Sequence, residues 1–381
     1  MHVAIDARMA QKPLSGPGRY AINLIRALSN LDNKNQYVVL QNINLRERIT
    51  RAENFKTIWI NHPPLSLRTI FWLRNILEKE EIQIYHSLYF LAPLRVNYPR
   101  IITVHDLMAL TFPDFFQGRS LPIKVYAKIF TNAFLRSSIA CSCRIITDSE
   151  AVRDEIIQWK PEYKRKISVV YPGVDSAFVK ENNQKRFENI KGKFDLTKKV
   201  ILYIGNTRPY KNLPRLIEAF KLLRIDNEGQ YQLVIGGGES RNLSFLKGLV
   251  YSLDLQNDVI FTGNLTDDEV KALMNVADIF AFPSLYEGFG LPPLEAMACG
   301  TPVVTSNAGA LPEIVGDAAL LIEPKNVNSL YLAMKRLLVD QHLRDTLIKK
   351  GFERVKLFSW EKTAIEILEV YKQVAKMKRE N

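Results

Sequence analysis

Short apolar runs alternate with stretches of helical periodicity along nearly all of this 381-residue chain. Apolar runs separated by helices are typical of parallel strands that are buried on both faces, so the alternation predicts α/β domains with helices on both sides of each sheet. In the first half the predicted strands are residues 2–5, 37–40, 57–60, 84–86, 101–104, 144–147 and 167–170. In the second half they are residues 200–204, 232–235, 259–262, 278–282, 302–305 and 319–322.

A polar, lysine-rich stretch interrupts the alternation near the middle of the chain. It predicts two Rossmann-like domains, residues 1–180 and 199–358, joined by a linker over residues 181–198. With 47% hydrophobic residues, the chain is long enough for two cores. An amphipathic pattern over residues 359–375, with Ser359 as its N-cap, predicts a final helix. We expect a substrate cleft between the two domains.

The stretch S-L-Y-E-G-F-G-L-P-P-L-E, which follows the predicted strand at 278–282, is the strongest candidate for a ligand site. Gly288 and Gly290 permit close approach to the backbone, and the amides of a helix that begins near Pro292 favour an anion. Glu287 and Glu295, placed before the glycines and on the first turn of that helix, can accept hydrogen bonds from sugar hydroxyls. The competing interpretation is a tight turn with two structural acids.

Two cations, Arg208 and Lys211, follow the predicted strand at 200–204 and stand at the start of a predicted helix. Helix starts normally carry acids, so cations there indicate a polyanionic ligand; otherwise they are solvated loop residues. Gly16 and Gly18 lie in the loop after the first strand, which either binds an anion or is simply a tight turn. The third glycine of the dinucleotide fingerprint is missing, which argues against a Rossmann oxidoreductase. His105 lies at a predicted strand end, where ligands bind in such sheets.

The motif E-G-F-G-L-P-P-L-E resembles the Glu-x7-Glu signature of glycosyltransferase family 4, whose members are retaining enzymes of the two-domain GT-B fold. The resemblance extends to G-P-G-R-Y, V-H-D-L and P-Y-K-N-L, and therefore to nearly the whole chain. It implies transfer of a hexose, with mannose as one candidate, from a nucleoside-diphosphate sugar to a saccharide or lipid-linked acceptor in surface polysaccharide or glycolipid synthesis. It also implies that the final helix packs on the N-terminal domain.

The same resemblance assigns roles to individual residues. Glu287 and His105 would contact the donor sugar, Glu295 the ribose, and Lys211 and Arg208 the diphosphate. The remaining donor-binding residues would be Gly16, Gly18, Leu265, Gly288, Phe289, Gly290 and Leu291. Many members carry an arginine directly after the strand-end glycine, where this chain has Asn206, and Arg208 is the candidate replacement.

The excess of positive over negative charge lies entirely in the first half of the chain. Residues 1–200 contain 31 Lys/Arg and 18 Asp/Glu, whereas residues 201–381 contain 21 and 22. No DNA- or RNA-binding motif accompanies this charge, so we expect no nucleic-acid partner. Residues 67–74 and 119–136 combine aromatic and basic side chains, and Lys124, Lys128 and Arg136 share one helical stripe. This stripe is either an ordinary solvated face or a contact with an anionic membrane surface.

The remaining patterns bear on metals, cofactors and location. No Asp-x-Asp or His/carboxylate cluster is present to hold a divalent ion, so we expect neither a metal nor another cofactor. Three cysteines in an odd count argue against a disulfide framework. The absence of a long apolar segment predicts a cytoplasmic chain, peripheral on the inner leaflet if the basic stripe binds lipid. A nucleotide-sugar epimerase of the same fold and a basic nucleic-acid-binding protein are the alternative functions.

Overall fold

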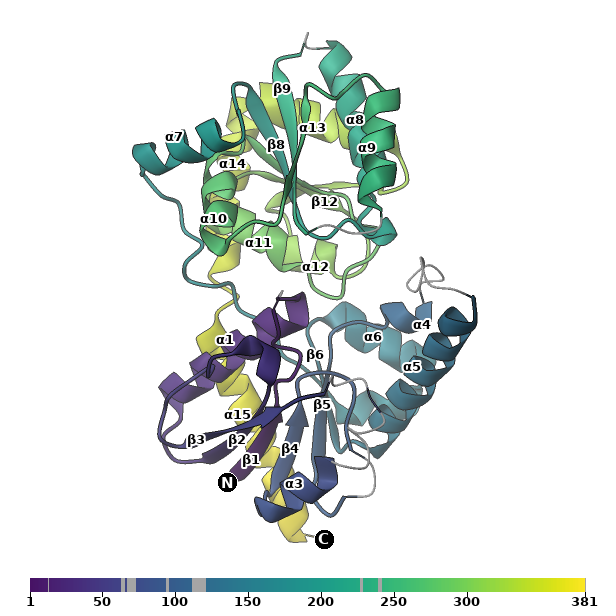
Figure 1. Ribbon diagram of the computed structural model, residues 1–381, viewed down its shortest axis with the longest axis vertical. Coiled ribbons are helices and arrows are strands. Elements are labelled where there is room, and N and C mark those ends of the chain that lie inside the picture. Colours follow the sequence, from purple (N-terminus) through teal and green to yellow (C-terminus); the bar gives the residue numbers. More distant parts are fainter. Residues whose placement is uncertain are drawn as a thin grey trace. The chain divides into compact units, whose positions relative to one another are not determined.

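The computed structural model describes residues 1–12, 14–62, 66, 73–93, 96–111, 121–226, 229–238 and 242–380. The chain divides into two compact units, each built on one parallel sheet (Figure 1). The first comprises Met1–Gly173 and Phe358–Asn381, and the second comprises Val174–Leu357. The prediction of two α/β domains with parallel sheets is therefore confirmed.

The first unit contains a seven-stranded sheet in the order β3-β2-β1-β4-β5-β6-β7. Its strands are β1 (His2–Asp6), β2 (Gln36–Asn42), β3 (Phe55–Ile60), β4 (Ile84–Ser87), β5 (Arg100–Val104), β6 (Arg144–Thr147) and β7 (Ile167–Val169). Its helices are α1 (Gly16–Leu31), α3 (Leu73–Lys79), α4 (Met108–Thr111), α5 (Leu121–Cys141), α6 (Glu150–Trp159) and α15 (Trp360–Glu380), with 3-10 turns η1 (Ile43–Leu45) and η2 (Pro161–Lys166). Every strand predicted in this half is present.

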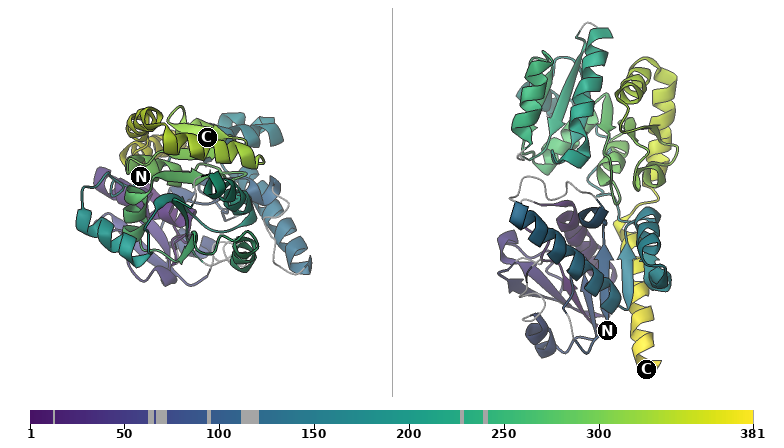
Figure 2. Two further views of the ribbon diagram at one scale, coloured as in Figure 1. Left: turned by 90° about the horizontal axis from the view of Figure 1, so that it is seen from above. Right: turned by 90° about the vertical axis from the view of Figure 1, so that its right-hand side faces the viewer.

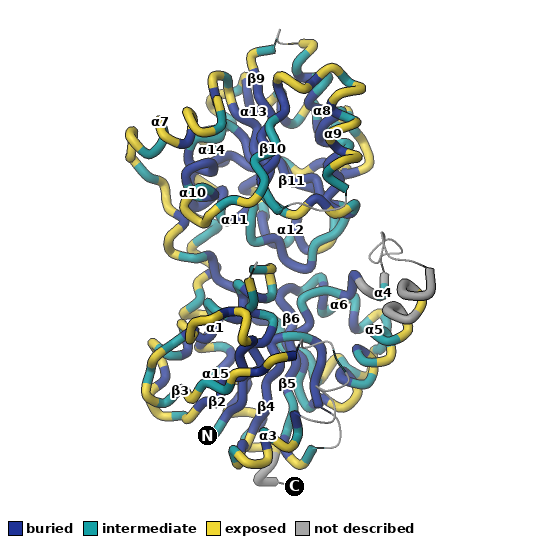
Figure 3. Tube along the Cα trace, in the orientation of Figure 1, coloured by how far each residue is buried: buried dark blue, intermediate teal, exposed yellow. Residues whose placement is uncertain are grey.

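Side chains of this sheet alternate between two apolar cores because successive residues of a strand point to opposite faces. Val3 and Ile5 of β1 pack in the core that contains α1 and α15, whereas Ala4 packs in the core that contains α3, α5 and α6. Figure 3 shows that the central strands are mostly buried while the helices expose their outer faces. A register shift of one residue would exchange the two cores, so the apolar pattern fixes the pairing.

The C-terminal helix α15 belongs to the first unit, as the family resemblance implied. It packs beside α1 and β4 (Figure 2). The Tyr371 hydroxyl shares a hydrogen bond with the buried His86 of β4, and its Oη lies 2.8 Å from His86 Nδ1. Ser359 accepts from the backbone N–H of Lys362 at 3.1 Å, which confirms its predicted capping role. A side chain at Gly173 would clash with the backbone of Trp360, so the two segments of this unit approach closely there.

The second unit contains a six-stranded sheet in the order β10-β9-β8-β11-β12-β13. Its strands are β8 (Lys199–Ile204), β9 (Tyr231–Gly236), β10 (Val259–Gly263), β11 (Ile279–Phe282), β12 (Val303–Ser306) and β13 (Ala319–Ile322). Its helices are α7 (Gln184–Lys193), α8 (Leu213–Asp226), α9 (Leu243–Ser252), α10 (Asp267–Val276), α11 (Leu291–Ala298), α12 (Leu311–Val315), α13 (Val327–Val339) and α14 (Gln341–Val355), with the 3-10 turn η3 (Pro209–Lys211). All strands predicted in this half are present.

The expected linker, residues 181–198, is an ordered part of the second unit. It contains α7, which packs against α10. Asn275 of α10 holds the preceding segment, because its Oδ1 accepts from the Glu181 N–H at 2.8 Å and its Nδ2 donates to the Val179 carbonyl at 3.0 Å. The first unit ends at Gly173, earlier than residue 180. The low apolarity of this stretch reflects a helix that buries only one side, and a flexible connector is not needed to explain it.

Candidate active site

The strand order of the second sheet places one crevice at the carboxyl ends of β8 and β11. These strands are neighbours, but the chain leaves β8 toward β9 and leaves β11 toward β12 on the opposite side. In open parallel sheets ligands bind at such a reversal, outside the carboxyl ends of the strands. Both the Arg208/Lys211 segment and the Glu287 segment follow these two strands. The topology thus brings the two predicted motifs to one edge.

Lys211 and Glu287 form an ion pair at this edge. The Lys211 Nζ lies 2.6 Å from the Glu287 Oε1, and the two side chains are only 9% and 13% exposed. The ammonium also lies over the Phe282 ring, 4.8 Å from its centre. The sequence analysis gave these residues separate roles with the diphosphate and the sugar, and it did not predict that they bind each other. A pair of a cation and a carboxylate can contact both parts of a nucleotide sugar.

Backbone contacts fix the loops that carry this pair. The Leu285 N–H donates to the Tyr210 carbonyl at 2.7 Å, which joins the β11–α11 loop to η3. Asn212 lies between η3 and α8 in the left-handed region (φ 61°), where asparagine is tolerated. Its buried Nδ2 donates to the carbonyls of Pro283 at 3.0 Å and Pro324 at 2.6 Å. Asn212 therefore connects three loops, a role that the sequence analysis missed because it depends on the strand order.

Lys211 and Arg208 precede the helix instead of standing at its start. Lys211 ends η3, and α8 begins only at Leu213 after the left-handed Asn212. Arg208 is exposed at the N-cap of η3, and its backbone N–H donates to Asn206 Oδ1 at 3.1 Å. Neither cation therefore stands in the first turn of α8, where it would oppose the helix dipole.

The glycine loop before α11 has the backbone geometry that the sequence suggested. Gly290 is the N-cap of α11 with φ 108°, a conformation that favours glycine, and a Cβ there would lie 2.6 Å from Leu311 Cδ2. Phe289 is buried, and Leu291 is the first helical residue. Glu295 is the fifth residue of α11, so it lies beyond the first turn in which we expected it. Gly288 lies in the loop itself.

Gly309, in the loop between β12 and α12, supports Glu287 from the other side. It has φ 57°, and a Cβ on it would lie 2.5 Å from the Glu287 carbonyl oxygen. The next residue, Ala310, donates its N–H to that oxygen at 3.0 Å. Any larger residue at 309 would displace the loop that positions Glu287. The sequence analysis gave Gly309 no role, although a glycine among small residues is compatible with such a close contact.

Glycines also bring β8 and β9 together at this edge. Gly237 would clash with the backbone of Gly205 if it had a side chain, and the Gly205 N–H donates to the Gly236 carbonyl at 2.9 Å. Leu265 is half-buried beside Gly236, and a Cβ added to Gly236 would lie 2.8 Å from Leu265 Cδ1. This apolar side chain is suited to contact with a base. Residues 239–241 of the neighbouring glycine-rich stretch lie outside the described residues.

At the carboxyl edge of the first sheet, His105 follows β5 and is held from two sides. Its Nδ1 lies 2.6 Å from Asp148 Oδ2, after β6, and its Nε2 lies 3.1 Å from the Leu88 carbonyl oxygen, after β4. Burial alone would lower the pKa of His105, but the Asp148 carboxylate, the Leu88 carbonyl and Asp106 together outweigh it and the pKa is raised. The ring of Tyr20 packs edge-on against that of His105, 4.8 Å between centres.

Gly16 and Gly18 lie in the first turn of α1 and differ in what surrounds them. A Cβ on Gly18 would lie 2.8 Å from the Met9 carbonyl oxygen, so Gly18 permits close packing of the preceding loop. A Cβ on Gly16 would meet nothing within 4 Å. Ser15 is the N-cap and accepts from the Gly18 N–H at 3.3 Å. Gly16 is therefore the member of the pair that is open to a ligand.

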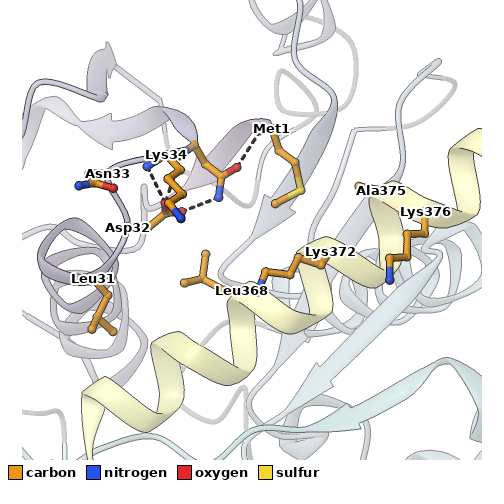
Figure 4. Close-up of a pocket in the computed structure, with 10 residues that line it drawn as sticks. Met1, Leu31, Asp32, Asn33, Lys34, Leu368, Lys372, Ala375 and Lys376 are labelled. Carbon is orange, nitrogen blue, oxygen red and sulfur yellow. Dashed lines mark hydrogen bonds between the residues drawn. The ribbon is translucent and has the colours of Figure 1, made fainter.

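A pocket of about 490 Å³ lies elsewhere, at the opposite edge of the first sheet (Figure 4). It is lined by the end of α1, the loop before β2, and α15. Asp32 at its base accepts from Asn35 Nδ2 at 2.5 Å and from the Tyr37 hydroxyl at 2.5 Å, so its carboxylate already has protein partners. No predicted site residue lies in this pocket. We therefore take the carboxyl edge of each sheet, separately for each unit, as the location of its candidate site residues.

Two properties of the described parts of the chain bear on partners. Within them, no group of three or more His, Cys, Asp or Glu side chains is arranged to hold a metal ion. The helices of the same described parts include none with the length and apolarity needed to cross a bilayer.

Two family models match the chain, one to each half. A model described as Glycosyltransferase Family 4 matches residues 14–178, and one described as Glycosyl transferases group 1 matches residues 184–354. The chain is 27% identical to the O-antigen chain mannosyltransferase B of Escherichia coli over 388 residues, which covers 98% of this chain and 100% of the relative. It is 31% identical to the serotype-specific mannosyltransferase WbdA of Escherichia coli over 75% of this chain but 35% of that protein.

Solved structures with the same fold cover nearly the whole chain. The sucrose-phosphate synthase of Thermosynechococcus elongatus superposes with a TM-score of 0.79 at 21% identity, covering 98% of this chain and 99% of that one. Anabaena HepE in complex with UDP and glucose superposes with a TM-score of 0.76 at 19% identity, covering 98% and 100%. These likenesses show the GT-B fold.

Proposed function

Because this chain is a GT-B glycosyltransferase of family 4, we propose that it transfers mannose from a nucleoside-diphosphate sugar to a saccharide or lipid-linked acceptor in surface polysaccharide synthesis. The observation that carries the proposal is the Lys211–Glu287 pair at the β8/β11 reversal, 2.6 Å between Nζ and Oε1. Lys211, with Arg208, would neutralise the diphosphate, and Glu287 would accept hydrogen bonds from the sugar hydroxyls. The choice of mannose is supported by the mannosyltransferases among the relatives.

Retention of configuration and independence of metal belong to the same proposal. Charge that develops on the departing diphosphate can be stabilised by preorganised cations and by backbone amides, which Lys211, Arg208 and the loop before α11 provide. Glu295 would contact the ribose, and Leu265 and Phe289 the apolar surface of the donor. Anomeric configuration of the product by NMR tests retention. Turnover after dialysis against a chelator tests metal independence, and a loss that added Mg²⁺ restores would contradict it.

A panel of GDP-, UDP-, ADP- and dTDP-sugars tests the donor assignment. A ligand at 100 times its Kd stabilises the folded state by about 2.7 kcal/mol, so the true donor should raise Tm clearly above the others. Incubation of that donor with and without acceptor then tests the reaction. Acceptor-dependent release of the nucleoside diphosphate supports transfer, whereas isomerisation of the sugar without acceptor supports the epimerase alternative.

We further propose peripheral attachment of the first unit to an anionic membrane through α5. Val125 and Ile129, one turn apart on this helix, are 50% and 64% exposed. The side chains of Lys124 and Lys128 lie outside the described residues, as do residues 67–72 of the other aromatic and basic segment. Arg136 places its guanidinium over the Trp159 ring at 4.9 Å, so one of the three cations is partly used within the protein. An exposed apolar pair beside basic residues suits an anionic bilayer surface.

Sedimentation with vesicles tests this attachment. The protein should pellet with anionic vesicles at low salt and be released as salt rises, because screening shortens the range of charge interactions to roughly 8 Å at physiological ionic strength. Ile129→Asp, and separately Lys124, Lys128 and Arg136 changed to Glu, should abolish pelleting. Pelleting that is equal with neutral vesicles, or absent for the unmodified protein, would end the proposal.

A further inference from the structure

We propose that Asp148 is a positioning residue that holds His105 as an imidazolium, so that His105 acts as a fixed cation and not as a proton acceptor. The inference deepens the proposed function, on which its kinetic test rests. It concerns the carboxyl edge of the first sheet, where β4, β5 and β6 end side by side. Asp148 had no role in the sequence analysis, because only the strand order shows that it meets His105.

The hydrogen bonds around the His105 ring determine where its protons lie. The Leu88 carbonyl oxygen, 3.1 Å from Nε2, can only accept, so Nε2 must carry a proton. The Asp148 Oδ2 lies 2.6 Å from Nδ1, a distance typical of a charge-assisted bond. If Asp148 is ionised, Nδ1 carries a proton as well and the ring is an imidazolium. The alternative is a neutral ring whose Nδ1 accepts a hydrogen bond from an Asp148 carboxylic acid.

Burial alone would favour the neutral pair because it penalises both charged forms, so the short contact between Nδ1 and Oδ2 is what supports the first arrangement. The side chains of Asp148 and His105 are 6% and 10% exposed, and Asp148 Oδ1 has no hydrogen-bond partner among the described residues. A carboxylate so poorly solvated requires a counter-charge, and the imidazolium is the group in contact with it. An arrangement that leaves one carboxylate oxygen unpaired is costly for stability. This cost is consistent with a role for Asp148 in controlling His105 instead of holding the fold together.

The groups that surround His105 on neighbouring elements act in the same direction. Asp106, next to it in the chain, also raises the pKa of His105. His86 of β4 has its pKa lowered to about 3 by burial and by the charge of His105, so it is neutral at physiological pH. Burial and the Asp148 charge raise the pKa of Tyr20 on α1, and the phenol is neutral too. Among the described residues, Asp148 and Asp106 therefore both favour the protonated form of the ring.

This arrangement limits what His105 can do in transfer. Both of its ring nitrogens donate to groups of the protein, so neither has a lone pair to take the proton of an acceptor hydroxyl. What the ring offers a ligand at this edge is a positive charge whose position is fixed from two sides.

The pH dependence of turnover distinguishes this role from a merely structural one. In the unmodified protein, His105 should not produce an inflection in kcat between pH 5.5 and 8. In Asp148→Asn the buried ring loses its counter-charge, and its pKa should fall to the ordinary value of about 6.5 or below. Turnover of this variant at pH 8 should then be at least tenfold below its own value at pH 5.5. Asp106→Asn is the matched control, because it removes a carboxylate next to the ring while leaving the contact between Asp148 and Nδ1 in place, and its profile should stay flat.

NMR of the His105 ring nitrogens tests the proton positions without any turnover assay. The unmodified protein should show both nitrogens protonated at pH 7, and Asp148→Asn should show a neutral ring. A neutral ring at pH 7 in the unmodified protein would overturn the proposal whether or not the variant folds. Parallel pH profiles for the two Asp→Asn variants would overturn it as well. If the NMR result holds but no sugar transfer is found with any donor, the proposed function fails and the proton assignment stands.

Discussion

The Lys211–Glu287 pair leads to an unusual expectation for Glu287→Gln. Glutamine keeps the size of the side chain but removes the charge that neutralises Lys211 at 2.6 Å. A diphosphate that binds Lys211 must compete with this carboxylate in the unmodified protein. Glu287→Gln should therefore bind the free nucleoside diphosphate more tightly, although it transfers sugar poorly because it lacks the acceptor for the sugar hydroxyls.

The magnitude follows from the geometry of the pair. Both side chains are largely buried, and a hydrogen bond between charged groups contributes about 1.5–3 kcal/mol. If the diphosphate gains that amount when the competing carboxylate is removed, its Kd falls by a factor of roughly 10 to 150. Loss of the partner should also destabilise the ligand-free fold by a similar amount, because Lys211 is left unpaired.

Calorimetric titration of the nucleoside diphosphate into the unmodified protein and Glu287→Gln measures this effect. Glu313→Gln is the control for general electrostatics, since Glu313 lies at the start of α12 in the same unit. The Lys211→Met variant and the double variant complete a cycle, and the gain from Glu287→Gln should vanish when Lys211 is absent. Weaker or unchanged binding by Glu287→Gln would show that Lys211 does not bind the diphosphate.

Three further predictions concern catalysis, stability and the loop that supports Glu287. Lys211→Ala should lower kcat by a factor of about 100 or more, the effect of removing one preorganised electrostatic group, and unchanged kcat would remove its proposed role. His86 has its pKa lowered to about 3 from 6.5, so only the unfolded chain takes up its proton as pH falls below 6.5. The free energy of unfolding should consequently fall by about 2 kcal/mol between pH 8 and pH 5 relative to His86→Gln, as measured by urea denaturation. The raised pKa of His105 has the opposite effect, because it contributes stability in acid that is lost as pH rises. The quantity to compare is therefore the difference in unfolding free energy between the unmodified protein and His86→Gln. Equal pH slopes for these two proteins would contradict this account of His86. Gly309→Ala should slow sugar transfer and lower the free energy of unfolding by about 1 kcal/mol or more. Gly16→Ala, whose added Cβ would meet no atom within 4 Å, should change the free energy of unfolding by no more than about 0.5 kcal/mol.

The sequence predicted the strands well because each is a short apolar run bounded by polar residues, as in Ile101–Val104. It also identified Lys211 and Glu287 separately, since each motif is local. Their direct contact depends on β8 and β11 being neighbours, which local patterns do not specify. The contact between His105 and Asp148 depends likewise on the pairing of β5 with β6.

Other differences have local physical causes. The helix after β8 was placed too early because Asn212 adopts a left-handed conformation that interrupts the helical pattern before Leu213. The segment at 181–198 was taken as a linker because α7 is mostly polar, yet contacts from Asn275 order the chain before it. Gly309 has a role that only the position of the Glu287 carbonyl reveals.

Hydrogen exchange of the backbone amides, with and without the donor that gives the largest rise in Tm, tests the placement of the donor site most directly. The account predicts that donor slows exchange in the β8–α8 segment around Lys211, in residues 284–291, and around Gly309. Protection restricted to the α15 pocket of the first unit, with these three segments unchanged, would contradict it.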